Sequence, residues 1–139
     1  MVGYTCGCFD LLHEGHILFL RECKKYCDFL IVGLATDERV KEQGKLLVKR
    51  PIIPYSERLL LLNALKDVSL VIPDTSGPLS IIKTLQPTYY FKGLDWEGKL
   101  PEEELLLCRE TNTEIKFIGS NSLTSTSKII TKIRELSEE

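Results

Sequence analysis

The sequence predicts an α/β fold, a doubly wound parallel sheet of about five strands with helices on both faces, formed as a single domain over residues 1–139. Two observations carry this prediction. Short runs rich in β-branched and aromatic residues alternate with helical patterns along the chain, as they do in βαβ units. The length of 139 residues, of which 43% are hydrophobic, also suits one domain with a buried core.

The strands are expected where apolar runs lie between turn residues, at residues 2–6, 28–34, 68–72, 88–91 and 114–118. A first helix is expected to continue through residues 17–26, and four more helices are expected at residues 57–66, 79–85, 102–109 and 125–136. Ser56 is a candidate N-cap for the second helix, and Pro101 suits the first position of the fourth. This alternation predicts a Rossmann-like sheet, in which ligands bind at the carboxyl ends of the strands.

Residues 36–54 are too long for a plain connection between a strand and a helix. Their basic side chains include Lys41, Lys45, Lys49 and Arg50. We therefore expect a mobile, basic loop that closes over an anion.

Composition argues against several classes of protein. Eighteen basic and twenty acidic residues give a formal net charge of −2, which disfavours a protein that coats nucleic acid or an anionic membrane. The apolar runs are too short to span a bilayer, and the first residues run into a strand without a leader pattern. We therefore expect a cytoplasmic protein whose five cysteines are reduced.

Residues 7–16 carry the most informative pattern in the chain. A strand is expected to end at Gly7 and a helix to begin near Gly15, so that His13 and His16 lie at the N-terminus of that helix. Free N–H groups and the positive end of the helix dipole favour a phosphate there. The imidazoles would donate hydrogen bonds to charge that develops during phosphoryl displacement.

Two other interpretations of these histidines compete with phosphate binding. Together with Cys6 and Cys8 they could ligate zinc, although the two cysteines alternate with their neighbours along a strand and no second cysteine pair follows. Alternatively, both histidines only cap the helix and contact no ligand.

The pattern Gly-x-Phe-Asp-x-x-His-x-Gly-His at residues 7–16 resembles the signature of the cytidylyltransferase-like nucleotidyltransferases. Four later segments resemble the same family in the same order, so the resemblance covers nearly the whole chain. They are residues 30–38, 51–58, 92–99 and 125–130. The resemblance implies a nucleotidyltransferase that uses Mg²⁺ bound through the nucleotide triphosphate rather than through protein side chains. It also implies a homodimer.

The resemblance implies roles for individual residues. His13 and His16 would stabilise the α-phosphate and the leaving pyrophosphate, while the acceptor phosphate attacks directly without a covalent enzyme intermediate. Lys45 or Lys49 would neutralise the phosphates. The nucleotide would be bound by Cys8, Phe9, Gly15, Gly93, Asp95, Thr124, Ser125, Thr126 and Ser127.

The acceptor substrate would be bound by a smaller set, Arg58, Asp37 and Trp96. Two of these residues have a simpler interpretation. Arg58 could pair with Glu57 or Asp67, and Trp96 could be a wall residue of the site.

The segment before the last helix departs from the cytidylyltransferase pattern Arg-Thr-x-Gly-Ile-Ser-Thr-Thr/Ser. Ser120 stands in place of the arginine that helps to hold CTP, and Leu123 in place of the glycine. Adenylyltransferases of the ADP-heptose-synthase type also lack that arginine, and they share the Gly-Cys-Phe-Asp and Lys-Gly segments. Residues 31–33 and 96–99 favour CTP, so we expect cytidylyl transfer to a small phosphorylated alcohol similar to glycerol 3-phosphate, with release of pyrophosphate.

Two alternatives stay open. One is ATP-dependent adenylyl transfer to a sugar phosphate, as in the ADP-heptose-synthase type. The other is a non-catalytic module that binds a nucleotide, which the presence of both signature histidines disfavours. All three interpretations predict CTP or ATP as a partner, and none involves nucleic acid or a membrane.

Overall fold

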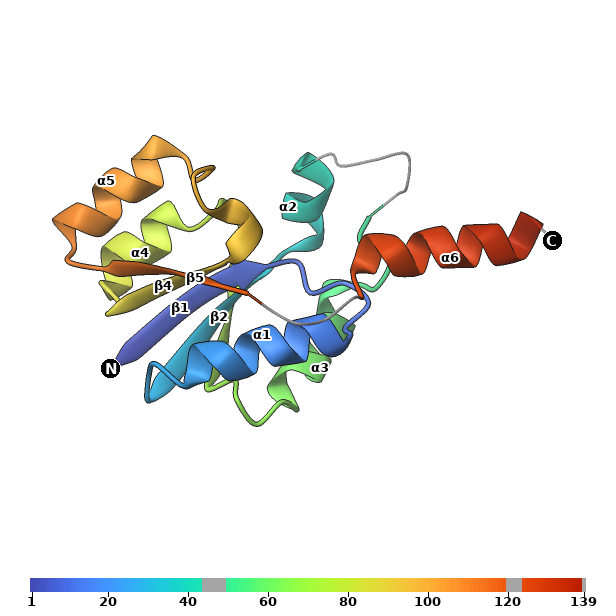
Figure 1. Cartoon of the computed structure of the whole chain (residues 1–139), viewed down its shortest axis with the longest axis horizontal. Coiled ribbons are helices and arrows are strands. Elements are labelled where there is room, and N and C mark those ends of the chain that lie inside the picture. The colour runs from blue at the N-terminus through green and yellow to red at the C-terminus, as the bar shows by residue number, and fades with distance from the viewer. Residues whose placement is uncertain (44–49, 120–123, 139) are drawn as a thin grey trace.

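Five strands form one parallel sheet in the order β3-β2-β1-β4-β5 (Figure 1). The computed structural model describes residues 1–43, 50–119 and 124–138. The strands are β1 (Val2–Gly7), β2 (Phe29–Ala35), β3 (Leu70–Asp74), β4 (Tyr89–Gly93) and β5 (Glu114–Ile118). The helices are α1 (Glu14–Lys24), α2 (Asp37–Glu42), α3 (Tyr55–Asn63), α4 (Leu79–Leu85), α5 (Glu102–Glu110) and α6 (Thr126–Glu138), with a short 3-10 helix, η1 (Leu94–Trp96). The predicted fold class is confirmed.

Helices α1 and α3 cover one face of the sheet, and α4 and α5 cover the other (Figure 1). Leu20 and Cys23 of α1 and Leu62 of α3 pack with strand residues in one core cluster. Ile82 of α4 and Cys108 of α5 pack in a second cluster on the opposite face. Burial of these side chains stabilises helices that are too short to form in isolation.

The strand order reverses at β1, which lies between β2 and β4. β1 pairs with β2 over six residues, whereas its register with β4 comprises Gly3 and Tyr4. Beyond that register, the hydroxyl of Thr5 donates to the carbonyl oxygen of Phe91 at 2.9 Å, so a side chain continues the contact between the strands. Open sheets of this kind bind ligands at the point where the order reverses, outside the carboxyl ends of the strands.

A helix lies within the segment that we expected to be a loop. α2 forms within residues 36–54 because Thr36 caps it, accepting from the N–H of Arg39 at 3.2 Å, and because Val40 is buried. A helix of six residues contributes too few apolar positions to show a helical period, so the sequence pattern does not indicate it.

Other contacts move helix starts away from their expected positions. α3 has Pro54 rather than Ser56 at its N-cap, because the Asp37 carboxylate accepts from the N–H of Tyr55 at 3.0 Å. By contrast, α1 begins at Glu14, within one residue of the start predicted near Gly15, and histidines form its cap. Pro101 is the N-cap of α5 rather than its first residue.

The last helix, α6, extends away from the sheet (Figure 1). Its apolar residues Ile133 and Leu136 are 57% and 60% exposed, so its amphipathic pattern does not mark a face of the core. Over the part of the chain that the structure describes, no helix combines the length and apolar character needed to cross a membrane.

Candidate active site

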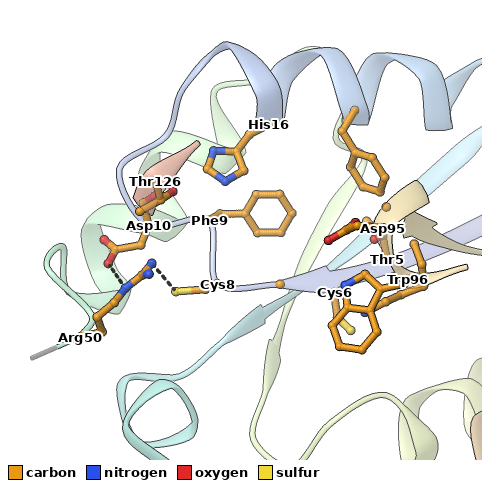
Figure 2. Close-up of a pocket in the computed structure, with 14 residues that line it drawn as sticks. Thr5, Cys6, Cys8, Phe9, Asp10, His16, Arg50, Asp95, Trp96 and Thr126 are labelled. Carbon is orange, nitrogen blue, oxygen red and sulfur yellow. Dashed lines mark hydrogen bonds and ion pairs between the residues drawn. The ribbon is translucent and has the colours of Figure 1, made fainter. Parts of the chain in front are cut away.

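The turn between β1 and α1 is held by a buried aspartate, Asp10. Its carboxylate accepts from the backbone N–H groups of Ile52 and Ile53 at 2.8 and 2.9 Å and from Nε of Arg50 at 3.3 Å. Its backbone carbonyl accepts from the hydroxyl of Thr126, at the start of α6, at 2.8 Å. Asp10 therefore joins three segments that are far apart in the sequence (Figure 2). Sequence reasoning missed this role, although Asp10 belongs to the Gly-Cys-Phe-Asp segment.

The two histidines cap α1 reciprocally. Nδ1 of His13 accepts from the N–H of Gly15 at 3.0 Å, and Nδ1 of His16 accepts from the N–H of His13 at 3.2 Å. The two ring centroids lie 3.9 Å apart. A neutral imidazole that accepts through Nδ1 carries its proton on Nε2. Each histidine therefore keeps an Nε2–H donor that the cap does not use.

Burial keeps these imidazoles neutral. Burial, together with the neighbouring His13, lowers the pKa of His16 to about 4. Burial also lowers the pKa of His13, while Glu14 opposes that shift. Both rings are therefore uncharged at pH 7 and act as hydrogen-bond donors rather than as cations.

Gly15 allows the starts of α1 and α6 to approach each other. A Cβ atom at Gly15 would lie 2.8 Å from Cε1 of His13 and 3.3 Å from the carbonyl oxygen of Thr124. Ser125 accepts from the N–H of Lys128 at 3.1 Å and so caps α6. Two helix N-termini, each favourable to an anion, therefore lie beside the same turn.

A cavity of about 270 Å³, here called the first cavity, lies between the carboxyl ends of β1 and β4 (Figure 2). Phe9 reaches it through a positive φ of 49°, and its ring centroid lies 5.3 Å from that of His16. Asp95 and Trp96 face it from η1 (Figure 2). Seven of the predicted site residues line the first cavity: Cys8, Phe9, His16, Gly93, Asp95, Trp96 and Thr126.

The structure does not bring all the predicted residues to the first cavity. Lys45 and Lys49 lie outside the described residues. Five residues lie beside the first cavity, at the starts of α1 and α6, without lining it: His13, Gly15, Thr124, Ser125 and Ser127.

Two basic residues line the first cavity: Arg50, which belongs to the basic segment expected to close over an anion, and Lys92, for which no role was predicted. The Arg50 side chain is 17% exposed and contacts Asp10 through Nε. Nζ of Lys92 lies 4.3 Å from the ring centroid of Trp96. Both side chains carry a positive charge of the kind that pairs with phosphate groups. The signals that point to them are the basic segment around Arg50 and the Lys-Gly pair after β4.

Comparison with known proteins identifies the family. The family model described as Cytidylyltransferase-like matches residues 4–132 of this chain. The chain belongs to the cytidylyltransferase-like family. It is a nucleotidyltransferase, as the histidine motif predicts.

Several curated relatives of this cytidylyltransferase-like chain are named Bifunctional protein HldE. The protein from Campylobacter fetus subsp. fetus is 42% identical over 133 residues, which cover 94% of this chain and 27% of the relative. That from Citrifermentans bemidjiense is 40% identical over 137 residues, covering 95% and 27%. The chain thus spans about a quarter of the length of these relatives. Among solved structures, a lipopolysaccharide core biosynthesis protein from Thermoplasma volcanium GSS1 is 29% identical, with a TM-score of 0.70, over 89% of this chain and 98% of the other.

These relatives correct the expected nucleotide and acceptor. HldE proteins are of the ADP-heptose-synthase type, which the sequence analysis treats as the alternative. The expectation of CTP and an acceptor similar to glycerol 3-phosphate is therefore wrong. Ser120, which departs from the cytidylyltransferase pattern, is the informative residue, and the segments at residues 31–33 and 96–99 do not identify the base.

Arg58 and Asp37, both predicted to bind the acceptor substrate, form an ion pair with each other. Nη2 of Arg58 donates to Oδ1 of Asp37 at 2.7 Å. The other nitrogens of Arg58 donate at 2.7–2.8 Å to the carbonyl oxygens of Cys8, Ala35 and Ile53. The Arg58 side chain has no exposed surface, so no ligand can reach it. This enclosure is at odds with a substrate contact for Arg58, whose partner is neither of the two acids expected from its position. The Asp37 side chain is 31% exposed, so its role in substrate binding stays a prediction.

The acidic groups of the first cavity fit a magnesium ion held by phosphates better than one held by the protein. Both oxygens of Asp10 already accept hydrogen bonds, which leaves Asp95 among the described lining carboxylates. Over the described residues, no three His, Cys, Asp or Glu side chains are grouped to hold a metal ion. Burial raises the pKa of Cys6 to about 11 and also raises that of Cys8, so both side chains are thiols at pH 7. Zinc binds thiolates, so this environment disfavours the zinc interpretation.

Proposed function

We propose that this chain is an adenylyltransferase that transfers AMP from ATP to the phosphate of a heptose 1-phosphate and releases pyrophosphate. The observation that carries the proposal is the reciprocal cap, which leaves the neutral Nε2–H of His16 at a cavity that Arg50 and Lys92 also line. The HldE relatives support the choice of substrates, because ATP yields an ADP-heptose only if the acceptor is a heptose 1-phosphate.

The reaction is an in-line displacement at phosphorus. An oxygen of the acceptor phosphate forms a bond to the α-phosphorus of ATP while the bond from that phosphorus to the bridging β-phosphate oxygen breaks. The electron pair of the broken bond leaves with pyrophosphate. His16 donates through Nε2–H to the α-phosphate oxygens as charge develops there, and Arg50 and Lys92 neutralise the phosphates. When bound through the triphosphate, Mg²⁺ would supply further charge neutralisation.

We assign the nucleoside to the side of the first cavity formed by the end of β4. Asp95 would accept hydrogen bonds from the ribose hydroxyls. Gly93 supports this position, because a Cβ atom there would lie 2.6 Å from Oδ1 of Asp95. Thr126, which is fixed to Asp10, would hold the N-terminus of α6 toward the phosphates.

The test is a pyrophosphate-release assay with each of ATP, CTP, GTP and UTP in the presence of Mg²⁺. Each nucleotide is combined with heptose 1-phosphate, glycerol 3-phosphate or phosphoethanolamine. We expect release only with ATP and heptose 1-phosphate. The His16→Asn variant, prepared in the same way, sets an upper limit on the activity that a contaminant contributes.

Two results would contradict the proposal. Release with CTP but not with ATP would reject the assignment of the base. ATP binding without release from any acceptor would indicate a non-catalytic nucleotide-binding module.

A further inference from the structure

A second cavity, of about 560 Å³, extends from the carboxyl ends of β1 and β4 toward α2 and α5. Arg50, Lys92 and Trp96 line both this second cavity and the first. The two cavities therefore meet at two basic side chains. A ligand in the second cavity would lie beside phosphates held in the first.

Arg39, on α2, lines the second cavity but not the first. Its Nε is buried without a hydrogen bond, and among the described residues no carboxylate pairs with its guanidinium. The guanidinium lies against Gly77, where a Cβ atom would come 3.2 Å from Nη2. A buried donor without an acceptor costs free energy. Arg39 thus places on a cavity wall a guanidinium that no carboxylate of the described residues pairs with, in contrast to Arg58, which is fully paired.

Two carboxylates also line the second cavity and are held in place by the protein. Glu104 accepts from the hydroxyl of Tyr90 at 2.7 Å, and Asp74 accepts from the N–H of Gly77 at 2.7 Å. Each carboxylate has a second oxygen that can accept from a ligand hydroxyl. The second cavity therefore combines guanidinium donors with carboxylate acceptors, which suits a ligand rich in hydroxyl groups.

We infer that the second cavity is the acceptor subsite and that Arg39 is a specificity-determining residue that donates to the sugar oxygens. Arg50 and Lys92, at the junction of the two cavities, would hold the reacting phosphate of the acceptor. This inference rests on the proposed function, because it takes the acceptor to be a sugar 1-phosphate. It assigns the sugar and the reacting phosphate to different basic residues.

The test compares the wild type with Arg39→Met. This substitution removes the guanidinium and leaves an unbranched apolar side chain in its place. In steady-state assays with ATP, we expect KM for heptose 1-phosphate to rise about 10- to 100-fold, since hydrogen bonds to charged groups are of that strength. KM for ATP should not change. Arg109→Met, at an exposed site on α5, is the matched control and should change neither constant. Arg39→Gln serves in the same way if the methionine variant fails to fold.

Equilibrium binding, measured by calorimetry without nucleotide, separates the sugar from its phosphate. Arg39→Met should bind heptose 1-phosphate more weakly than the wild type does and should bind inorganic phosphate with the same affinity. If the affinity for inorganic phosphate falls equally, the assignment of Arg39 to the sugar is wrong. If the affinity and the KM for heptose 1-phosphate are both unchanged, the assignment of the second cavity as the acceptor subsite is wrong. A third outcome separates the two proposals. If Arg39→Met loses heptose 1-phosphate binding but the wild type releases no pyrophosphate, the acceptor subsite is retained and the proposed function is rejected.

Discussion

The starts of α1 and α3 lie at the same edge of the sheet and use their polar residues in opposite ways. At α1, His13 and His16 each use one ring nitrogen as a cap and keep the other as a donor. At α3, Arg58 is enclosed and donates to three carbonyl oxygens and to Asp37. Residue type and position suggest a phosphate contact in both places. The hydrogen bonds already made within the protein, rather than charge, decide which side chain is available to a ligand.

The largest effect is expected on stability when Arg58 is changed. Arg58→Met removes the guanidinium that donates to three carbonyl oxygens and to the Asp37 carboxylate, so the free energy of unfolding should fall by about 3–5 kcal/mol. At this chain length the melting temperature should fall by roughly 10 °C or more. Thermal and urea unfolding measure this change, with Arg109→Met as the surface control.

The kinetic constants of the folded Arg58→Met protein sharpen the comparison. We expect KM for both substrates to stay near the wild-type values, because Arg58 contacts no ligand. A stable Arg58→Met protein with a greatly raised KM for the acceptor would show that the side chain binds substrate after all.

At α1 the effect should fall on catalysis instead. In His16→Asn, the amide oxygen takes the place of Nδ1 and keeps the cap, but the Nε2–H donor is lost. We expect kcat/KM for pyrophosphate release to fall about 100- to 1,000-fold. The melting temperature should change little, because the acceptor for the N–H of His13 is retained.

His16→Gln is the complementary variant. Its amide nitrogen replaces Nε2 as a donor, while the cap is lost, at a cost of about 1 kcal/mol in the free energy of unfolding. We expect more activity and less stability than in His16→Asn. The opposite ranking would mean that His16 only caps the helix.

A smaller effect is expected from pH. The pKa of His16 is about 4 in the folded protein and near its ordinary value of 6.5 when unfolded, so the unfolded chain binds more protons between these values. The contribution of the neutral ring to stability is therefore complete above pH 6.5 and is lost as the pH falls toward 4. Urea unfolding across this range should show a smaller loss for His16→Asn than for the wild type. An equal loss in both proteins would place the folded pKa of His16 near its unfolded value.

The sheet follows from the sequence because its strands are continuous apolar runs. Residues such as Leu30, Ile31 and Val32 are buried between two helical layers, and a run of this kind is visible without knowledge of its partners. α2 is not visible in this way, because its cap at Thr36 and its single buried residue, Val40, carry no periodic signal.

The residues of the candidate site likewise fall into those that a local sequence pattern predicts and those that only the folded structure brings together. Phe9 and His16 are predicted because they belong to one contiguous motif, in which spacing fixes geometry. The contact of Arg50 with Asp10 joins residues 40 apart, and that of Arg58 with Cys8 joins residues 50 apart. No local pattern encodes such pairs, so the sequence cannot tell an enclosed arginine from an available one.

The most direct test of the account is the tautomer of His16, read from the ¹⁵N chemical shifts of the imidazole nitrogens. The chain has two histidines, so a His13→Gln protein assigns both signals. We predict that His16 is neutral at pH 7 and protonated on Nε2, with a pKa of about 4. A neutral ring protonated on Nδ1, or a pKa at the ordinary value of 6.5, would contradict the donor role on which the proposed catalysis depends.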